Sequence, residues 1–516
     1  MTVVLTHRHL ENQLITIEMK TKKETQKGRR EFIRNSSLAF LGLTVVPSHV
    51  VSGLGHVAPS DKLNIAGVGV GGKGHANLTG MNSENIVALC DIDWKYAKAC
   101  FDSFPNAKRY WDWRKMFDEM GKSIDAVMIS TADHTHAIIA AHAMIMGKHV
   151  YCQKPLTHSI YESRLLTKLA RKYKVATQMG NQGNSGEDVK DLCEWIWNGE
   201  IGEVREVHAW SNRPIWPQGL MRPTEKMATP KTLNWDLFLG PAPERPFHSI
   251  YTPWNWRGWW DFGTGAFGDM ACHVLDPVYS ALRLGYPTKI QGSSTLLNTE
   301  SAPQAEVVTF TFPARDNLPK LALPAVDITW YDGGLLPNRP ELLPPGVGLM
   351  DDGLGGCIFI GSKDALFCGC GGQGKKLLSG RVPVVPKTLR RIPGAKGYVD
   401  GPHEQDWVRA CKESPESRTE TSSNFAYAGP FNEMVLLGVL AVRLQNLKKI
   451  LEWNGSTMEF TNIGAHEELS VVTSDEFKIV EGHPHFNTQY AKFNALETAR
   501  EYIRHGYRTG WTLPEV

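Results

Sequence analysis

The chain has 516 residues, of which 42% are hydrophobic and 21% are charged, and its formal net charge is +2. This length is too great for one hydrophobic core and suits two or three domains. The nearly balanced charge excludes a strongly basic nucleic-acid-binding protein, and we predict no nucleic-acid partner. The nine cysteines contain no Cys-x-x-Cys pair, so we predict no metal site and thiols that stay mostly reduced.

The first sixty residues are typical of an export signal. Arg29 and Arg30 stand in a pattern that resembles a bacterial twin-arginine signal, and an apolar run at residues 36–51 follows them. That run is shorter than the ~20 residues that cross a bilayer, so we expect no stable membrane insertion. We predict that translation starts at Met19, that residues 1–60 are signal and linker, and that the protein is periplasmic. The alternative is a basic arm followed by a short buried helix.

From residue 61 the pattern becomes strand, turn and helix. A buried strand at residues 63–70 leads into Gly69-x-Gly71-x-x-Gly74, and a second strand ends at Asp91. An acidic residue about 20 positions after such a turn is typical of dinucleotide-binding folds. The cofactor-binding residues predicted in this segment are Gly69, Gly71, Gly72, Lys73, Gly74 and Asp91.

Each of these residue types has a physical reason. Glycines let backbone N–H groups approach a pyrophosphate at a helix N-terminus. The carboxylate of Asp91 would accept hydrogen bonds from ribose hydroxyls and repel a 2′-phosphate, which favours NAD over NADP. Lys73, inside the turn, would partly offset that preference.

Further motifs extend this pattern. A third strand at residues 123–130 is followed by "TADHTH", and "GKHVYCQKP" comes next. Together with "GVGGKG" and "CDID", these motifs resemble the Gfo/Idh/MocA oxidoreductase family, which includes glucose–fructose oxidoreductase and inositol dehydrogenase. The resemblance runs from about residue 62 to the C-terminus. It implies an α/β Rossmann domain with a doubly wound parallel sheet, which we assign to residues 61–182, and a substrate and oligomerisation domain at residues 183–516.

The resemblance also implies a reaction centre. Lys154 matches the lysine of the family's "EKP" motif, beside the nicotinamide and the reacting carbon. Gln153 stands where the family has glutamate, so it can bind the ribose but brings no charge. Asp269 and His273 match a D-x-x-x-H pair, with the histidine beside the reacting hydroxyl. Either Lys154 or His273 could take the hydroxyl proton near neutral pH. Taken alone, such an i, i+4 pair is more often a cap or a surface ion pair.

Five more residues are predicted to contact the cofactor. The loop that follows the strand at residues 123–130 lies at the ligand edge of a parallel sheet, and the resemblance implies cofactor contact there. Asp133 could also cap the following helix. A sixth strand at residues 176–185 would point toward the nicotinamide end. The residues of these two segments are Asp133, His134, His136, Asn181 and Gln182.

The second half alternates apolar and polar residues, for example at residues 203–213, which predicts an α+β domain with a large, mostly antiparallel sheet. Tryptophans gather at residues 195–260. Flat apolar rings suit the C–H faces of a sugar, so we predict that Trp256, Trp259 and Trp260 bind carbohydrate together with Arg257. His403 could reach the same cleft or cap its helix. Residues 501–513 could grip a neighbouring subunit of a homodimer or homotetramer.

Export and a dinucleotide site together set a constraint. A periplasmic enzyme has no reliable pool of free NAD(H), so its cofactor must be inserted before export and must not dissociate. The predicted activity is therefore hydride transfer between a ring hydroxyl of a sugar or glycoside and a tightly bound NAD. The alternatives are glycoside cleavage through a transient 3-keto sugar, and a non-catalytic sensor that retains NAD.

Overall fold

The computed structural model describes residues 61–341, 343, 345–349, 353–397 and 400–515. The predicted export signal lies outside these residues. The chain separates into two compact units, Met1–Leu63 and Asn64–Val516, and the second unit holds all the features described below.

The first part of this unit is a six-stranded parallel sheet in the order β3-β2-β1-β4-β5-β6. Strands β1 and β4 are almost entirely buried, as expected for parallel strands covered on both faces. This confirms the predicted Rossmann sheet. Its strands are β1 (Asn64–Val68), β2 (Asn85–Cys90), β3 (Lys108–Tyr110), β4 (Ala126–Ile129), β5 (His149–Cys152) and β6 (Thr177–Met179). Its helices are α2 (Lys73–Gly80), α3 (Lys98–Ser103), α4 (Trp113–Met120), α5 (Asp133–Ile145) and α6 (Ile160–Tyr173).

The second part is built on a nine-stranded sheet in the order β15-β14-β13-β7-β12-β9-β8-β16-β17. All neighbours are antiparallel except β7 and β12, so the predicted antiparallel sheet is confirmed with one parallel pair. Its strands are β7 (Val204–Ser211), β8 (Lys289–Ser294), β9 (Glu306–Phe312), β12 (Val326–Tyr331), β13 (Gly355–Gly361), β14 (Ala365–Gly369), β15 (Lys376–Leu377), β16 (Leu451–Asn454) and β17 (Glu459–Phe460). Two short strands, β10 (Arg315–Leu318) and β11 (Leu321–Leu323), pair separately.

Helices cover one face of this sheet. Strand β9 alternates strictly between buried and half-buried residues, which is the pattern of a sheet with one covered face. The remaining helices are α7 (Glu187–Trp197), α8 (Trp235–Leu239), α9 (Gly265–Val274), α10 (Asp276–Ala281), α11 (Pro402–Cys411), α12 (Phe425–Arg443) and α13 (Ala495–Ile503).

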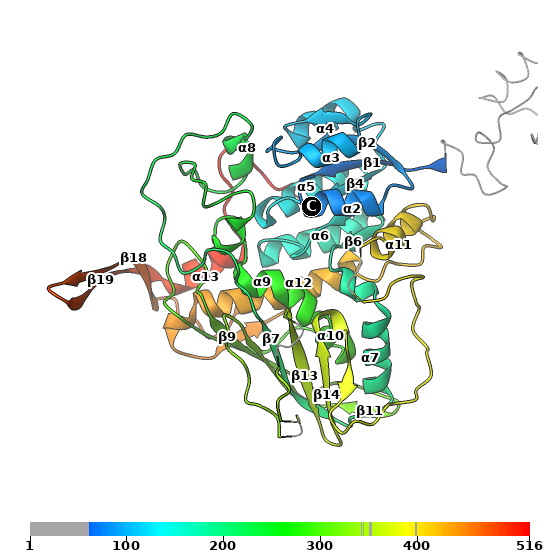
Figure 1. Ribbon diagram of the computed structural model, residues 1–516, viewed down its shortest axis with the longest axis vertical. Helices are drawn as coiled ribbons and strands as arrows, with labels where there is room; N and C mark the ends of the chain where they lie inside the picture. Colours follow the sequence, from blue (N-terminus) through cyan, green and yellow to red (C-terminus); the bar gives the residue numbers. More distant parts are fainter. Residues whose placement is uncertain (1–60, 342, 344, 350–352, 398–399, 516) are drawn as a thin grey trace, which may run out of the picture. The chain divides into compact units, whose positions relative to one another are not determined.

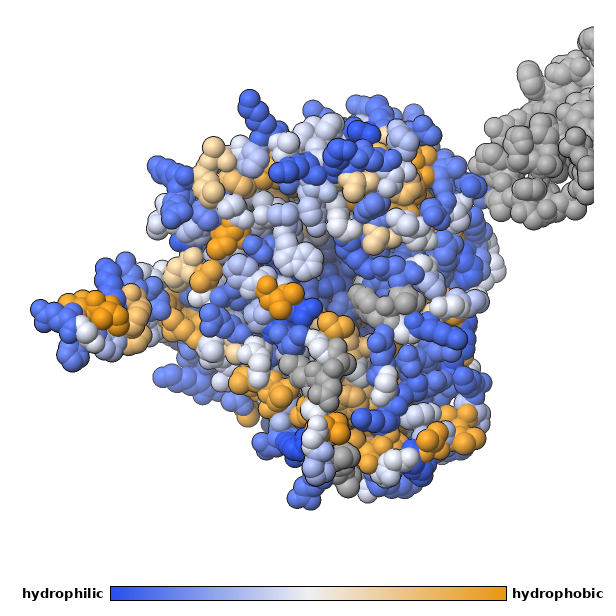
Figure 2. Space-filling view, viewed as in Figure 1, coloured by the Kyte–Doolittle hydropathy of each residue, from blue (hydrophilic) through white to orange (hydrophobic). Residues whose placement is uncertain are grey.

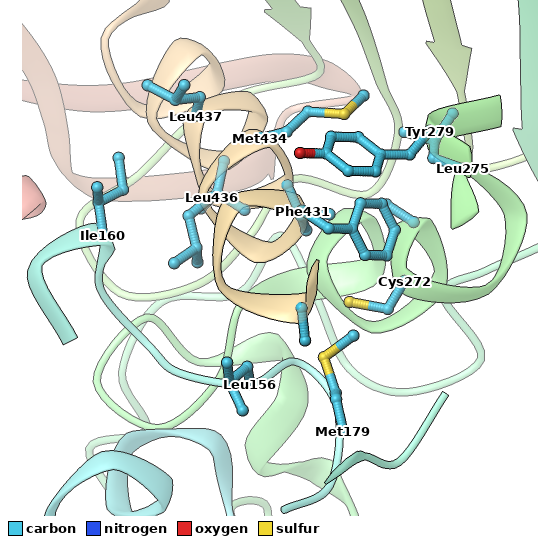
Figure 3. Packing of buried hydrophobic residues seen from close by; sticks show 14 of the residues in the cluster. Leu156, Ile160, Met179, Cys272, Leu275, Tyr279, Phe431, Met434, Leu436 and Leu437 are labelled. Atoms are coloured by element: carbon cyan, nitrogen blue, oxygen red, sulfur yellow. The ribbon is translucent and has the colours of Figure 1, made fainter. Parts of the chain in front are cut away.

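Helix α12 is the centre of the core. It packs against α6 of the Rossmann part and against α9, β8 and β9 of the second part. Figure 3 shows its side chains Phe431, Met434 and Leu436 among Leu156, Met179 and Cys272. A β-carbon on Gly438 would lie 2.4 Å from the Phe267 ring, so glycine permits the close approach of α12 to α9. Among the described residues, α12 alone is long and apolar enough to cross a membrane, and 83% of its apolar window is buried.

Candidate active site

The glycine turn between β1 and α2 leaves no room for side chains. Gly69 has a φ of +74°, and a β-carbon there would lie 2.7 Å from the backbone of Ser130 and Thr131. A β-carbon on Gly74 would lie 1.9 Å from the carbonyl oxygen of Gly69. The turn therefore brings strand and helix backbone together, as a pyrophosphate cradle requires.

Asp91 lies against this turn at the end of β2. Its Oδ2 accepts hydrogen bonds from the backbone N–H groups of Val70 and Gly71 at 2.8 and 3.1 Å. Its Oδ1 accepts from the N–H of Asp93 at 2.9 Å. Burial raises the pKa of Asp91 to about 6, although these amide donors favour the carboxylate. This is the position from which a carboxylate can reach adenosine ribose hydroxyls.

Two side chains border the outer side of the turn. The ring of Tyr96 packs against Gly71 and Gly72, so a β-carbon on either glycine would collide with it. Lys73 forms an ion pair with Asp400 from the segment before α11. Tyr96 could not be predicted from the sequence, because a tyrosine in the turn between β2 and α3 carries no signal of its own.

The reaction-centre residues come from distant parts of the chain. Lys154 follows β5, and its Nζ donates to Oδ1 of Asp269 on α9 at 2.8 Å. Arg257 donates from Nε to the same Oδ1 at 3.0 Å. One carboxylate thus joins two cations. Because Gln153 brings no charge beside Lys154, Asp269 is the anion that pairs with this lysine.

Burial and charge set the ionisation of the pair on α9. Burial alone would raise the pKa of Asp269, but Lys154 and Arg257 together hold it below its ordinary value. His273 lies one turn further along and is 7% exposed. Burial, and then the positive charge of Lys154, hold the pKa of His273 well below its usual range. The imidazole is therefore neutral at neutral pH and able to accept a proton.

A single cavity of about 570 Å³ joins the glycine turn to these residues. This volume lies within the usual range for small-molecule and cofactor sites. The predicted site residues that line it are Gly69, Gly71, Gly72, Lys73, Asp91, His134, Gln153, Lys154, Trp256, Arg257, Asp269 and His273. Those outside its lining are Gly74, Asp133, His136, Asn181, Gln182, Trp259, Trp260 and His403.

The motif after β4 serves mainly to hold neighbouring loops. His134 Nε2 lies 3.0 Å from the carbonyl oxygen of Phe238, and burial lowers its pKa to about 4. His136 lies between the carbonyl oxygens of Pro155 and Thr131, and burial lowers its pKa to about 4 as well.

Asp133 accepts a hydrogen bond from Thr264 Oγ1 at 2.9 Å, and burial raises its pKa to about 7. The predicted helix cap by Asp133 is wrong, because α5 begins at Asp133 and Ala132 holds the cap position.

Three residues predicted near the nicotinamide or substrate form buried hydrogen bonds away from the cavity. Asn181 donates to Asp276 at 3.0 Å, and Gln182 donates to Glu404 at 3.2 Å. His403, in the first turn of α11, bonds to Ser185 and to the carbonyl oxygen of Met179. None of the three is among the residues that line the cavity.

Aromatic residues surround the guanidinium of Arg257. It lies 4.0 Å from the ring centre of Trp254 and 4.3 Å from that of Trp256. Trp259 and Trp260 are 0% and 5% exposed and belong to the hydrophobic core. The cavity lining also contains aromatic residues that the sequence analysis did not single out, namely Trp111, Trp113, Trp216, Phe238 and Trp511.

The segment at residues 212–257 crosses over the cofactor edge of the parallel sheet. Asn234 N donates to the carbonyl oxygen of Ile92, and Trp94 N donates to that of Thr232. This segment contributes Trp254 and other lining residues to the cavity. It therefore closes the cavity on the side opposite the Rossmann sheet.

The C-terminal tail holds this segment in place. Arg508 forms an ion pair with Asp236 at 2.7 Å and donates to the carbonyl oxygen of Gly240. Trp511 lies 6.4 Å from Trp113, ring centre to ring centre, and lines the cavity. The tail thus packs on its own chain, and the expected contact with a neighbouring subunit stays a prediction.

Among the described residues, no cluster of three or more His, Cys, Asp or Glu side chains is arranged to hold a metal ion.

Comparisons with known proteins agree with this two-part fold. Residues 62–181 match the family described as "Oxidoreductase family, NAD-binding Rossmann fold", and residues 203–306 match its C-terminal alpha/beta domain. Inositol 2-dehydrogenase of Salmonella typhimurium is 28% identical over 28% of this chain and 44% of its own length. Levoglucosan dehydrogenase of Pseudarthrobacter phenanthrenivorans is 26% identical over 32% of this chain and 34% of its own length. The chain thus matches less than half the length of these relatives.

A solved structure shows the same fold. The WlbA dehydrogenase from Bordetella pertussis, in complex with NADH and UDP-GlcNAcA, superposes with a TM-score of 0.50 at 15% identity. The match covers 76% of this chain and 99% of that one.

Proposed function

Because the chain belongs to the Gfo/Idh/MocA family of oxidoreductases with an NAD-binding Rossmann fold, we propose that it oxidises a ring hydroxyl of a sugar or glycoside. The cofactor is NAD rather than NADP, and it stays bound through turnover. The observation that carries this proposal is the shared cavity, in which Lys154, Asp269 and His273 face the glycine turn.

The residues of the turn fit a nicotinamide dinucleotide. Gly69 and Gly74 permit a close approach of strand and helix backbone that any β-carbon would block, and Asp91 presents a carboxylate beside them. When bound, NAD supplies the acceptor for the hydride that leaves the carbinol carbon. The carboxylate of Asp91 would repel the extra phosphate of NADP, which supports the choice of NAD.

Proton transfer is the task of the residues on α9 and after β5. The neutral imidazole of His273 accepts the hydroxyl proton as the carbon is oxidised. The ammonium group of Lys154, held by Asp269, stabilises the negative charge that develops on that oxygen. Arg257 completes the pairing of Asp269 and fixes its position.

The substrate class rests on two observations. The names of the relatives specify inositol and levoglucosan as substrates. In this chain Trp254 and Trp256 bring flat apolar faces to the cavity beside the polar Arg257. Such a surface suits the C–H faces and hydroxyls of a sugar ring.

Two features support the proposed retention of the cofactor: the segments that border the cavity and the predicted export signal. The segment at residues 212–257 and the tail around Trp511 both border the cavity. The segment is hydrogen-bonded to the loop after β2 of the Rossmann part, and Arg508 of the tail is ion-paired with Asp236 of the segment. A cofactor enclosed in this way would travel with the folded protein through a twin-arginine route to the periplasm. Binding would also stabilise the folded state before export.

The experiment is to denature freshly purified protein and identify the released nucleotide by absorbance and mass. We expect close to one NAD(H) per chain, and no NADP. A protein that is purified empty and binds neither coenzyme when offered would contradict the proposal.

Sugars and glucosides are then screened for a change in the reduced-nicotinamide absorbance of the bound cofactor. Lys154→Ala and His273→Ala should abolish that change while the nucleotide stays bound. Solvent deuterium uptake at C2 together with bond cleavage would instead indicate the glycoside-cleaving reaction. A ligand response that survives both substitutions would indicate a sensor.

A further inference from the structure

A long β-hairpin projects from the body of the protein. Strands β18 (Glu468–Val480) and β19 (His483–Asn494) pair only with each other, apart from one bridge between Asn298 and Val472 at the base. Figure 1 shows the hairpin extending away from the helices and sheets. We call residues 474–489 the arm. Nothing in the arm is buried.

Toward its tip, one face of the arm is apolar, whereas Asp475 and Thr488 occupy that face nearer the base. Register pairs Phe477 with Phe486 and Ile479 with Pro484, and these residues share a face because side chains alternate along a strand. Phe477, Ile479 and Phe486 are 56%, 60% and 71% exposed. Figure 2 shows hydrophobic surface on the projecting hairpin. A two-stranded hairpin is at best marginally stable in water, and a third strand with an apolar face is the usual remedy.

The two edges of the arm are not equivalent. Strand β19 contains Pro484, which lacks an N–H group and blocks pairing along its outer edge. Strand β18 contains no proline, and beyond Val472 its outer edge has no partner strand among the described residues. An edge of this kind is a template for another strand. The available position is therefore beside β18.

The charges on β18 favour a second copy of the same strand as its partner. Glu476 and Lys478 lie on the polar face on either side of Phe477, 3.1 Å apart. If a second β18 lies antiparallel with Phe477 opposite Phe477, each Glu476 faces a Lys478 of the other copy, and each Lys478 faces a Glu476. If the pairing were centred on Glu476 or on Lys478 instead of Phe477, two glutamates or two lysines would lie opposite each other, which is unfavourable.

We infer that the arm is a dimerisation element, in which β18 of two copies of this chain pair antiparallel about Phe477 to form a continuous four-stranded sheet. The arrangement is isologous, as in most homodimers. It adds main-chain hydrogen bonds along two open edges and places four phenylalanines in one row on the apolar face. The arm does not border the cavity, so this inference is independent of the proposed activity.

Cysteine cross-linking of the full-length chain tests the register. All nine native cysteines are buried, so an added surface thiol is the reactive one. Phe477→Cys places two thiols opposite each other across the two-fold axis, at a separation that a disulfide can span. Ile479→Cys is the matched control. In the same register the two residues 479 lie about four residues apart along the strands, too far for a disulfide. With diamide as oxidant, we expect a covalent dimer for Phe477→Cys and monomer for Ile479→Cys.

Charge reversal tests whether Glu476 of one copy pairs with Lys478 of the other. Sedimentation equilibrium at micromolar concentration should show a dimer for the unchanged chain. Lys478→Glu should raise the dimer dissociation constant at least tenfold, and the double swap Glu476→Lys with Lys478→Glu should restore it. A monomeric unchanged chain, equal cross-linking at both cysteine positions, or no difference between the single and double charge variants would overturn the inference. NAD content measured on the same samples shows separately whether the cavity is intact.

Discussion

The nucleotide end and the reacting end of the cavity are built in different ways. The nucleotide end is made by a short stretch of chain, from Gly69 to Asp91, and its specificity comes from backbone that no side chain obstructs. The reacting end depends on an ion pair between residues 115 positions apart, Lys154 and Asp269. Steric freedom of the backbone therefore governs the nucleotide end, and charge balance governs the reacting end. Substitutions at the two ends should impair the protein in different ways.

The largest effect is expected at the reacting end. Asp269→Asn removes the carboxylate that joins Lys154 and Arg257 and leaves two buried cations facing each other. Breaking a buried pair in this way costs about 3–5 kcal/mol of folding stability. Because Lys154 is then no longer held where it can stabilise the developing charge, turnover should fall on the order of a thousandfold. The rate is followed by the reduced-nicotinamide absorbance with an accepted sugar. Asp188→Asn, which removes a partner of Lys375 elsewhere in the fold, should leave turnover within about twofold.

The nucleotide end should fail through stability and binding instead. Gly74→Ala puts a β-carbon 1.9 Å from a carbonyl oxygen, so α2 must move away from β1. We expect the free energy of unfolding to fall by on the order of 3 kcal/mol and bound NAD to be lost. Denaturant unfolding and nucleotide content measure both.

Gly285→Ala is the matched control, since a β-carbon there meets no atom within 4 Å. Its stability should change by less than about 0.5 kcal/mol. Equal effects of the two glycine substitutions would contradict the steric account of the turn.

Ionisation of Asp91 should make nucleotide affinity depend on pH. Its pKa is raised to about 6, and only the carboxylate can accept from both ribose hydroxyls. Affinity should therefore be constant above about pH 7 and fall by up to tenfold per unit below about pH 6. Calorimetric titration of NAD into apoprotein measures this. Asp91→Asn should bind weakly with a flat profile, and a parallel pH dependence in that variant would exclude Asp91 as the cause.

The smallest effect is expected from the tail. Trp511→Ala removes an aromatic wall of the cavity without touching Lys154 or His273. We expect the release of bound NAD to quicken roughly tenfold, which corresponds to about 1.4 kcal/mol, with the chemical step unchanged. Nucleotide retained after gel filtration measures release, and single-turnover absorbance measures the chemistry. A slower chemical step with unchanged retention would contradict a role in closing the cavity.

Local patterns in the sequence predicted much of the fold. The predicted strands at residues 63–70, 123–130 and 203–213 correspond to β1, β4 and β7. The long hairpin β18–β19 was missed because alternation is weak where neither face is buried. Trp259 and His403 were assigned to the site from their residue type, whereas the structure buries both away from the cavity.

The sequence by itself determined the glycine turn, the acidic residue that follows it and the two sheets, because these depend on backbone conformation and on periodicity between near neighbours. Only the tertiary structure decided which charges meet. The pairing of Lys154 with Asp269 and Arg257, the closure of the cavity by Trp511 and the exclusion of Asn181 and Gln182 from its lining all join distant segments. Such contacts arise from the packing of α9, α12 and the tail against the Rossmann part, and no local pattern of residues encodes them.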